Sequence, residues 1–483
     1  MKRLLTLALV AGVIGGIGAA GASGASGASG ASGASGASGA AQAARIYAIQ
    51  GARIVPVSGA VIDNGTIVFR DGVITAVGAN VTVPVGAQVL AGKGLTVYPG
   101  LIDMGSTAGL AMPAVPRLEN PNTREDVERA KANYLLRAQL RAADYVDPTA
   151  SALGRAASAG ITSVLATPSG DAIRGQSALI TTALPDDEPQ IGAVADERKG
   201  VMVLKAPVAL HVTFSRQPGG GSAYPNSLMG VIAFVRQAFL DAQHFAAAQK
   251  YAEGASSAAG AAADESAPSA QRALLRLNYQ PAFEAMQPAL AGRLPVAFEG
   301  ASAREILRGL DMAKRFTLDP IITNGREAGE VAADLKAVNA RVILSLNYPT
   351  RPENLAPDAD EPLRVLRDRA NAPKTAAALV KAGVPFAFAT SGLNEPRDFI
   401  RNAAKAVQNG LSREDAVRAL TLQAATIAGA ADRLGSLETG KMANVLVTEG
   451  DLFAEKMQIK HVFVDGRPVN IEAPAAESSR RGQ

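Results

Sequence analysis

The sequence predicts an α/β protein in which a closed barrel of alternating strands and helices carries a small β-domain built from both chain ends. With 483 residues, the chain is long enough for one large barrel and an accessory domain. Strand-like and helix-like segments alternate from residue 96 to about residue 430, as in a parallel sheet. Because this repeat fills the whole middle, eight strand–helix units in a closed (β/α)8 barrel are favoured over an open doubly wound sheet.

The N-terminus reads as a secretory signal followed by a spacer. Lys2 and Arg3 precede an uncharged, mostly apolar run that ends near Ile17. The run is short for a membrane span, so we expect no membrane association beyond the signal peptide, with an uncleaved anchor as the open alternative. Six Gly-Ala-Ser triplets follow at 21–38 and cannot build a core. We assign residues 1–43 to signal and spacer, and expect a periplasmic or secreted protein.

Short β segments lie on both sides of the long middle. The pattern over 60–69 predicts a hairpin on Asn64-Gly65, whose residues accept positive φ. A second hairpin is predicted at 461–469, on an Asp-Gly turn. We therefore expect one composite β-sandwich formed by residues 45–95 and 435–475, followed by a tail at 476–483.

The middle of the chain, residues 96–434, carries the predicted barrel. Ser302 and Glu305 have the spacing of a capping box and begin a helix after an apolar strand. Further strands are predicted at 319–323, 340–346 and 385–390, with helices near 362–382 and 395–408. The segment 252–272 is rich in Ala, Ser and Gly, and we expect a long surface loop there.

Composition excludes several kinds of site. Cysteine is absent, which excludes disulfides, thiolate zinc sites, iron–sulfur clusters and a cysteine nucleophile. Only three histidines occur, at positions 211, 244 and 461. The net charge is +4, and aromatic residues make up 4% of the chain. Nucleic-acid binding is therefore not expected.

Several motifs together resemble the amidohydrolase superfamily. They are Pro99-Gly100-Leu101-Ile102-Asp103, the helical segment 411–422, and the Gly-x-Leu-x-x-Gly-Lys-x-Ala signature within 432–447. The segment 167–176, with its Ile173-Arg174-Gly175-Gln176, resembles a loop of imidazolonepropionase-like members, which are often exported. The resemblance implies a TIM barrel with a composite β-sandwich. It also implies hydrolysis of non-peptide C–N bonds by one or two divalent metals, zinc among them.

The sequence departs from the metal-ligand pattern that this resemblance implies. The family's His-x-His after the first barrel strand is replaced by Gly105 and Thr107. At the fifth strand, Glu299-Gly300-Ala301 stands where the subgroup has His-Ala-His. Asn324 takes a histidine position at the sixth strand, and Ser391 takes the aspartate position at the eighth. We therefore predict that the metal site is lost, and we predict no cofactor.

Two residues are the candidate catalysts that survive. Glu299 ends an apolar strand and could act as a general base or as a ligand, although a salt bridge or a solvated rim residue explains it equally well. His211 follows an apolar run and could point into the barrel mouth, although a single hydrogen-bonded histidine is the more ordinary interpretation. His244 and His461 are expected to have no functional role. The remaining pocket candidates are Asp103, Gly105, Thr107, Asn324 and Ser391, with Asp103 expected mainly as a structural acceptor.

Two hypotheses for function follow. In the first, the chain is an impaired or inactive amidohydrolase relative, a pseudoenzyme that binds a small molecule or pairs with another copy or with an active relative. In the alternative, it is an active hydrolase of amide or cyclic amide substrates with a rewired site around Glu299 and His211.

Overall fold

The computed structural model describes residues 45–113, 123–126, 134–182, 201–215, 225, 227–261, 280–356 and 358–471. For the end of the long helix, residues 254–261, only the backbone is described. The described residues belong to one compact unit, Ala44–Gln483. The expected signal and spacer at 1–43, the tail at 476–483, and residues 262–272 of the expected loop lie outside the described residues.

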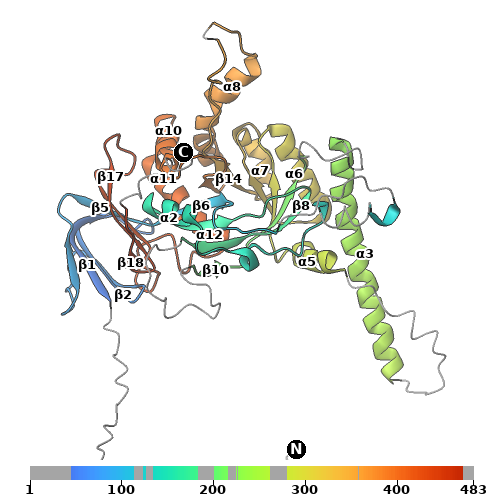
Figure 1. Cartoon of the computed structure of the whole chain (residues 1–483), viewed down its shortest axis with the longest axis horizontal. Coiled ribbons are helices and arrows are strands. Elements are labelled where there is room, and N and C mark those ends of the chain that lie inside the picture. The colour runs from blue at the N-terminus through green and yellow to red at the C-terminus, as the bar shows by residue number, and fades with distance from the viewer. Residues whose placement is uncertain are drawn as a thin grey trace, which may run out of the picture. The chain divides into compact units, whose positions relative to one another are not determined.

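One sheet combines strands from the two ends of the described chain (Figure 1). Its strand order is β18-β17-β16-β5-β1-β2-β3, and β4 pairs with β1. The antiparallel pairing of β16 with β5 joins the two ends, with Val447 opposite Val97. The strands are β1 (Ile46–Ile54), β2 (Ile62–Arg70), β3 (Val73–Gly78), β4 (Gln88–Ala91), β5 (Leu95–Pro99), β16 (Val445–Glu449), β17 (Gln458–Val464) and β18 (Arg467–Pro468).

The expected hairpin on Asn64-Gly65 is wrong. Strand β2 runs through both residues and pairs with β1, and the register shifts at this point as in a β-bulge. Gly65 fits because an added Cβ would lie 2.7 Å from the Ile54 side chain. The expected hairpin at 461–469 is confirmed, since β17 and β18 pair across Asp465-Gly466, both with positive φ.

Two further sheets form the α/β part of the molecule. One has the order β10-β9-β7-β6 and the other β15-β14-β13-β12-β11-β8. Strands β11 to β15 are parallel, as are β6 and β7, whereas β8, β9 and β10 pair antiparallel. The α/β class is therefore as expected, but the sheets are mixed rather than uniformly parallel. The strands are β6 (Leu101–Ser106), β7 (Ile161–Ala166), β8 (Ile173–Gln176), β9 (Ala178–Thr181), β10 (Val203–Lys205), β11 (Leu210–Thr213), β12 (Val296–Glu299), β13 (Pro320–Thr323), β14 (Arg341–Ser345) and β15 (Phe386–Ala389).

Helices follow most of these strands. The predicted capping box is confirmed: Ser302 accepts the backbone N–H of Glu305, and the Glu305 carboxylate accepts the N–H of Ser302. The helices are α2 (Ser151–Ser158), α3 (Leu228–Ala261), α5 (Pro281–Leu290), α6 (Ala303–Phe316), α7 (Ala332–Ala337), α8 (Leu363–Asn371), α9 (Thr375–Ala382), α10 (Asp398–Gln408), α11 (Arg413–Leu420) and α12 (Leu422–Ala428), with 3-10 turns η2 (Ala142–Tyr145), η3 (Ala328–Val331) and η4 (Ala372–Lys374).

The expectation of a loop at 252–272 is wrong for its first part. Helix α3 continues to Ala261, so residues 252–261 are helical. Alanine has the highest helix propensity of the residues, and it is frequent in this stretch. Composition rich in Ala, Ser and Gly therefore did not distinguish a loop from the end of a long helix.

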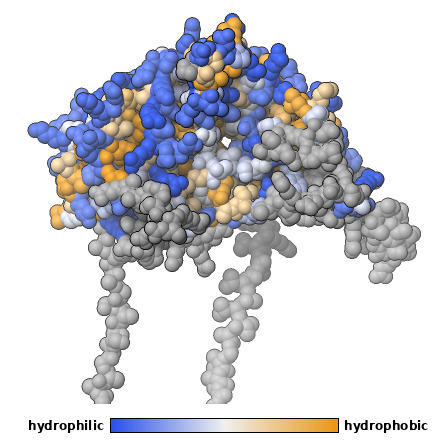
Figure 2. All heavy atoms as spheres, turned by 45° about the horizontal axis from the view of Figure 1, so that its top comes forward, coloured by the Kyte–Doolittle hydropathy of each residue, from blue (hydrophilic) through white to orange (hydrophobic). Residues whose placement is uncertain are grey.

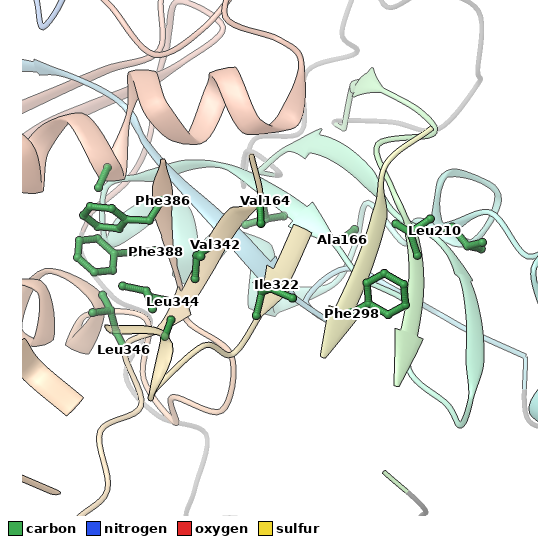
Figure 3. Packing of buried hydrophobic residues seen from close by; sticks show 14 of the residues in the cluster. Val164, Ala166, Leu210, Phe298, Ile322, Val342, Leu344, Leu346, Phe386 and Phe388 are labelled. Carbon is green, nitrogen blue, oxygen red and sulfur yellow. The ribbon is translucent and has the colours of Figure 1, made fainter. Parts of the chain in front are cut away.

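Successive residues of the parallel strands pack into two different clusters, so both faces of these strands are buried. On β15, Phe386 and Phe388 belong to the larger cluster, whereas Ala387 and Ala389 belong to the other. Figure 3 shows members of the larger cluster on neighbouring strands, with Ile322 and Val342 among them. The second cluster draws residues from both α/β sheets: Ile102, Leu165, Leu179, Ala297, Ile321, Ile343 and Ala387. The two sheets therefore share one core.

On the face displayed in Figure 2, hydrophilic residues predominate and hydrophobic ones form separate patches. Among the described residues, none of the helices has the length and apolar character needed to cross a membrane.

Candidate functional site

The candidate residues lie where parallel strands end. Glu299 is the last residue of β12, Asn324 directly follows β13, and Ser391 follows β15 by two positions. The carboxyl ends of parallel strands meet at one edge, which is where ligands bind in α/β proteins. A cavity of about 540 Å³ opens there. Six of the seven predicted site residues line it: Gly105, Thr107, His211, Glu299, Asn324 and Ser391.

Asp103 does not line the cavity, although it precedes the lining residues Met104 and Gly105, and it joins β6 to the end of β15. Its side chain is 1% exposed. One oxygen accepts the backbone N–H groups of Gly105 at 3.1 Å and Thr390 at 2.8 Å, and the other accepts the Thr390 hydroxyl at 2.5 Å. Burial raises the pKa of Asp103 above its usual value, although these hydrogen bonds act in the opposite direction. Both oxygens are therefore committed to internal donors.

Gly105 and Ser391 form a second link between the same strand ends. The Gly105 carbonyl accepts the backbone N–H of Ser391 at 3.1 Å and its hydroxyl at 3.0 Å. A Cβ added at Gly105 would lie 2.7 Å from the Ser391 hydroxyl oxygen. A histidine at position 105 would therefore have to displace Ser391.

His211 is an almost fully buried side chain that reaches the cavity from β11. It is 3% exposed, and its Nε2 has no hydrogen-bond partner among the described residues. Burial lowers the pKa of His211 to about 3, and the positive charge of Arg174 contributes to this shift. His211 is therefore a neutral imidazole at physiological pH, and it cannot act there as a general acid.

We predict that the His211 NMR signal will not titrate between about pH 5 and pH 8, because its pKa lies below this range. The chain has only three histidines, so their ring signals can be resolved in one spectrum. A His211→Gln variant assigns the signal by its disappearance. A titration midpoint for that signal above about pH 5 would contradict the buried, neutral state.

Arg174 is the site residue that sequence analysis missed. It lies on β8, where Nε donates to the Gly170 carbonyl at 2.7 Å and Nη2 donates to Oε2 of Glu299 at 2.5 Å. Both side chains line the cavity and are mostly shielded, at 17% exposure for Arg174 and 30% for Glu299. A cation in the short strand Ile173–Gln176, whose other members are buried, was the signal that could have identified it. The salt-bridge interpretation of Glu299 is therefore the one that the structure displays.

Of the remaining residues considered in the sequence, Asn324 and Thr107 line the cavity, whereas His244 and His461 do not. Asn324 has a φ of 71°, a left-handed conformation that asparagine tolerates better than most residues and that is common at functional sites. Thr107 is exposed at the cavity edge. His244 lies on α3 and His461 on β17, and neither lines the cavity.

A protein-family model and several solved structures are similar to this chain. Residues 330–469 match the model of the amidohydrolase family. An amidohydrolase from Thermotoga maritima has a similar structure, with a TM-score of 0.68 and 22% identity over 88% of this chain and 99% of that chain. At this identity the likeness concerns the fold.

Two further solved structures are more distant. A putative prolidase from Bifidobacterium longum has a TM-score of 0.48 at 16% identity, over 88% of this chain and 94% of that one. The ochratoxinase of A. niger has a TM-score of 0.46 at 15% identity, over 88% and 95%. No curated protein matches the sequence.

The donors at this edge do not fit the divalent metal that the sequence resemblance implies. Glu299 is paired with a guanidinium, and the oxygens of Asp103 accept three internal hydrogen bonds. Within the ranges that the structure describes, no group of three or more His, Cys, Asp or Glu side chains could hold a metal ion. A tight zinc site needs three or four protein ligands.

Proposed function

We propose that this chain is an amidohydrolase relative that binds a small molecule in the cavity at the strand ends without metal-dependent hydrolysis. The single observation that carries this proposal is the ion pair between Arg174 and Glu299 inside the cavity. It neutralises the carboxylate that best qualified as a metal ligand or general base. The cavity itself has the volume of a small-molecule site.

The family assignment is supported by the model match at residues 330–469, and the fold is supported along most of the chain. The family model covers the C-terminal part, and the overall likeness to the Thermotoga protein extends over 88% of the chain. We propose that the two α/β sheets form one closed barrel. The hydrogen bonds from Ser391 to Gly105 and from Thr390 to Asp103 support this closure, as does the core that both sheets share. The strands from both chain ends likewise support a composite β-domain.

Hydrolysis by Glu299 and His211 has less support. Oε2 of Glu299 is held by Arg174, and Nε2 of His211 has no partner among the described residues. A base and the group that it activates need hydrogen-bond contact, directly or through one water. We propose export to the periplasm or the medium, which the signal-like pattern of residues 1–20 supports. We also propose that a partner completes the site, either another copy of this chain or an active relative.

The first test is the metal content of the purified protein. After incubation with zinc, manganese or iron and desalting, we expect less than about 0.1 equivalent of any metal by elemental mass spectrometry, since the site lacks a full ligand set. One or two equivalents would contradict the proposal, and hydrolase assays of the wild type and Glu299→Ala would then follow.

Ligand binding is tested on the same metal-free protein. A panel of amides, cyclic amides and carboxylic acids is screened by native mass spectrometry. A Thr107→Trp variant fills the cavity from its exposed edge without removing a side-chain hydrogen bond given by the structure. Compounds that bind the wild type and not this variant identify the ligand class. Binding that is unchanged in the variant would place the ligand elsewhere.

A further inference from the structure

Arg174 forms its ion pair with a residue that is two strands away in the sheet. Strand β8 pairs with β11, and β11 pairs with β12, so β11 separates Arg174 from Glu299 in the sheet. The ion pair therefore spans the end of β11, the strand that carries His211. The Gly170 carbonyl on one side and Glu299 on the other fix the direction of the guanidinium.

We propose that Arg174 takes the place of a divalent metal in this cavity. Its guanidinium binds Glu299 and excludes such a metal. Its Nη1 donates a hydrogen bond to an oxygen atom of the bound small molecule. The part concerning the ligand rests on the proposed function. The part concerning metal exclusion stands on the ion pair alone.

Charge explains the exclusion. A metal ion at Glu299 would have to displace the guanidinium or approach it, and like charges repel strongly in a partly shielded site. His211 responds to the same charge, because Arg174 disfavours a proton on its imidazole. A metal ion would bind His211 through a nitrogen lone pair of the imidazole, as a proton does. Arg174 therefore disfavours a metal ion both at Glu299 and at His211.

Hydrogen-bond capacity indicates the ligand chemistry. Nε and Nη2 of Arg174 have acceptors, whereas Nη1 has none among the described residues. Asn324 lines the same cavity, and its side-chain amide has no hydrogen-bond partner in the part of the chain that the structure describes. Both groups donate N–H bonds, which an oxygen acceptor satisfies. The ligand class is therefore a small molecule with a carbonyl or carboxylate oxygen.

The metal part is tested with Arg174→Met in the full chain, which keeps the length of the side chain and removes its charge. Arg174→Lys keeps the charge, and Arg155→Met removes an arginine on α2 outside the cavity. Co²⁺ is the probe, because its absorption spectrum reports coordination without any activity assay. We expect Arg174→Met to bind Co²⁺ at least about tenfold more tightly than the wild type and both controls. Adding Glu299→Gln to Arg174→Met should abolish that gain.

The outcomes separate the two proposals. If the wild type itself binds Co²⁺ in the cavity, the proposed function fails. If the wild type and Arg174→Met are equally metal-free while circular dichroism shows both folded, only the inference about Arg174 fails.

The ligand part uses Glu299→Gln, which keeps Arg174 and is informative even if Arg174→Met does not fold. Acetate and acetamide are titrated against the protein by ligand-observed NMR. Removing the competing carboxylate should strengthen acetate binding at least about threefold, since charged partners bind arginine more tightly than neutral ones. A gain for acetamide alone assigns a carbonyl ligand, and a gain for acetate assigns a carboxylate. No gain for either would overturn the ligand role.

Discussion

Replacing Asp103 with alanine is expected to lower the free energy of unfolding by about 3 kcal/mol, because buried donors lose their acceptor. The backbone N–H groups of Gly105 and Thr390 and the Thr390 hydroxyl all bond to this carboxylate. The two bonds to Thr390 connect β6 with the end of β15, since Asp103 and Thr390 are 287 residues apart in the sequence. The substitution therefore removes one of the links that hold the cavity edge together.

The measurement is urea unfolding followed by circular dichroism, with Asp103→Asn as the matched variant. Asparagine keeps one oxygen acceptor for the N–H groups, and the Thr390 hydroxyl can turn to accept from the new amide. We expect Asp103→Asn to stay within about 1 kcal/mol of the wild type. Equal losses in the two variants would show that the hydrogen bonds are not the cause.

The wild type and Asp103→Asn are also expected to differ in how their stability depends on pH. The pKa of Asp103 is higher in the folded state than the usual value, so the folded state binds its proton more tightly than the unfolded state does. The stability linked to this group is full below the unfolded pKa of about 3.9 and is lost as the pH rises through the folded pKa. Relative to Asp103→Asn, the wild type should therefore lose stability on going from about pH 4 to neutral pH.

Local patterns were enough to predict much of the fold. The capping box at Ser302 and Glu305 and the hairpin at Asp465-Gly466 depend on residues within a few positions of each other. The strand β15 was visible as an apolar run because both of its faces are buried. In each case, residues close together in the sequence determine the local structure, so the sequence alone predicts it.

Contacts between distant segments explain what the sequence did not reveal. Asn64-Gly65 has the composition of a turn, yet β1 pairs with β2 on both sides of it, so this stretch forms a bulge within the strand. The Arg174–Glu299 pair joins residues 125 positions apart, so no spacing rule could detect it. The candidate positions at the strand ends were predictable because every parallel strand ends at the same edge. The side chains that bond to them, such as Arg174 for Glu299, were not predictable in this way.

Gly175→Ala is expected to lower the free energy of unfolding by about 3 kcal/mol, because it combines backbone strain with a clash that cannot relax. Gly175 has a φ of 121°, and an added Cβ would lie 2.5 Å from the Leu140 carbonyl oxygen and 3.2 Å from that of Arg137. Both atoms belong to the backbone, so no side-chain rotation removes the conflict. The residue also pairs with His211 and directly follows Arg174.

Gly154→Ala is the matched control. It lies on helix α2, and an added Cβ there meets nothing within 4 Å. Alanine is favoured over glycine in a helix, so this variant should gain about 0.5–1 kcal/mol. Thermal and urea unfolding compare the two variants with the wild type. If Gly175→Ala proves as stable as Gly154→Ala, the strand β8 can move away from residues 137–140, and Arg174 is then held less rigidly than its two hydrogen bonds indicate.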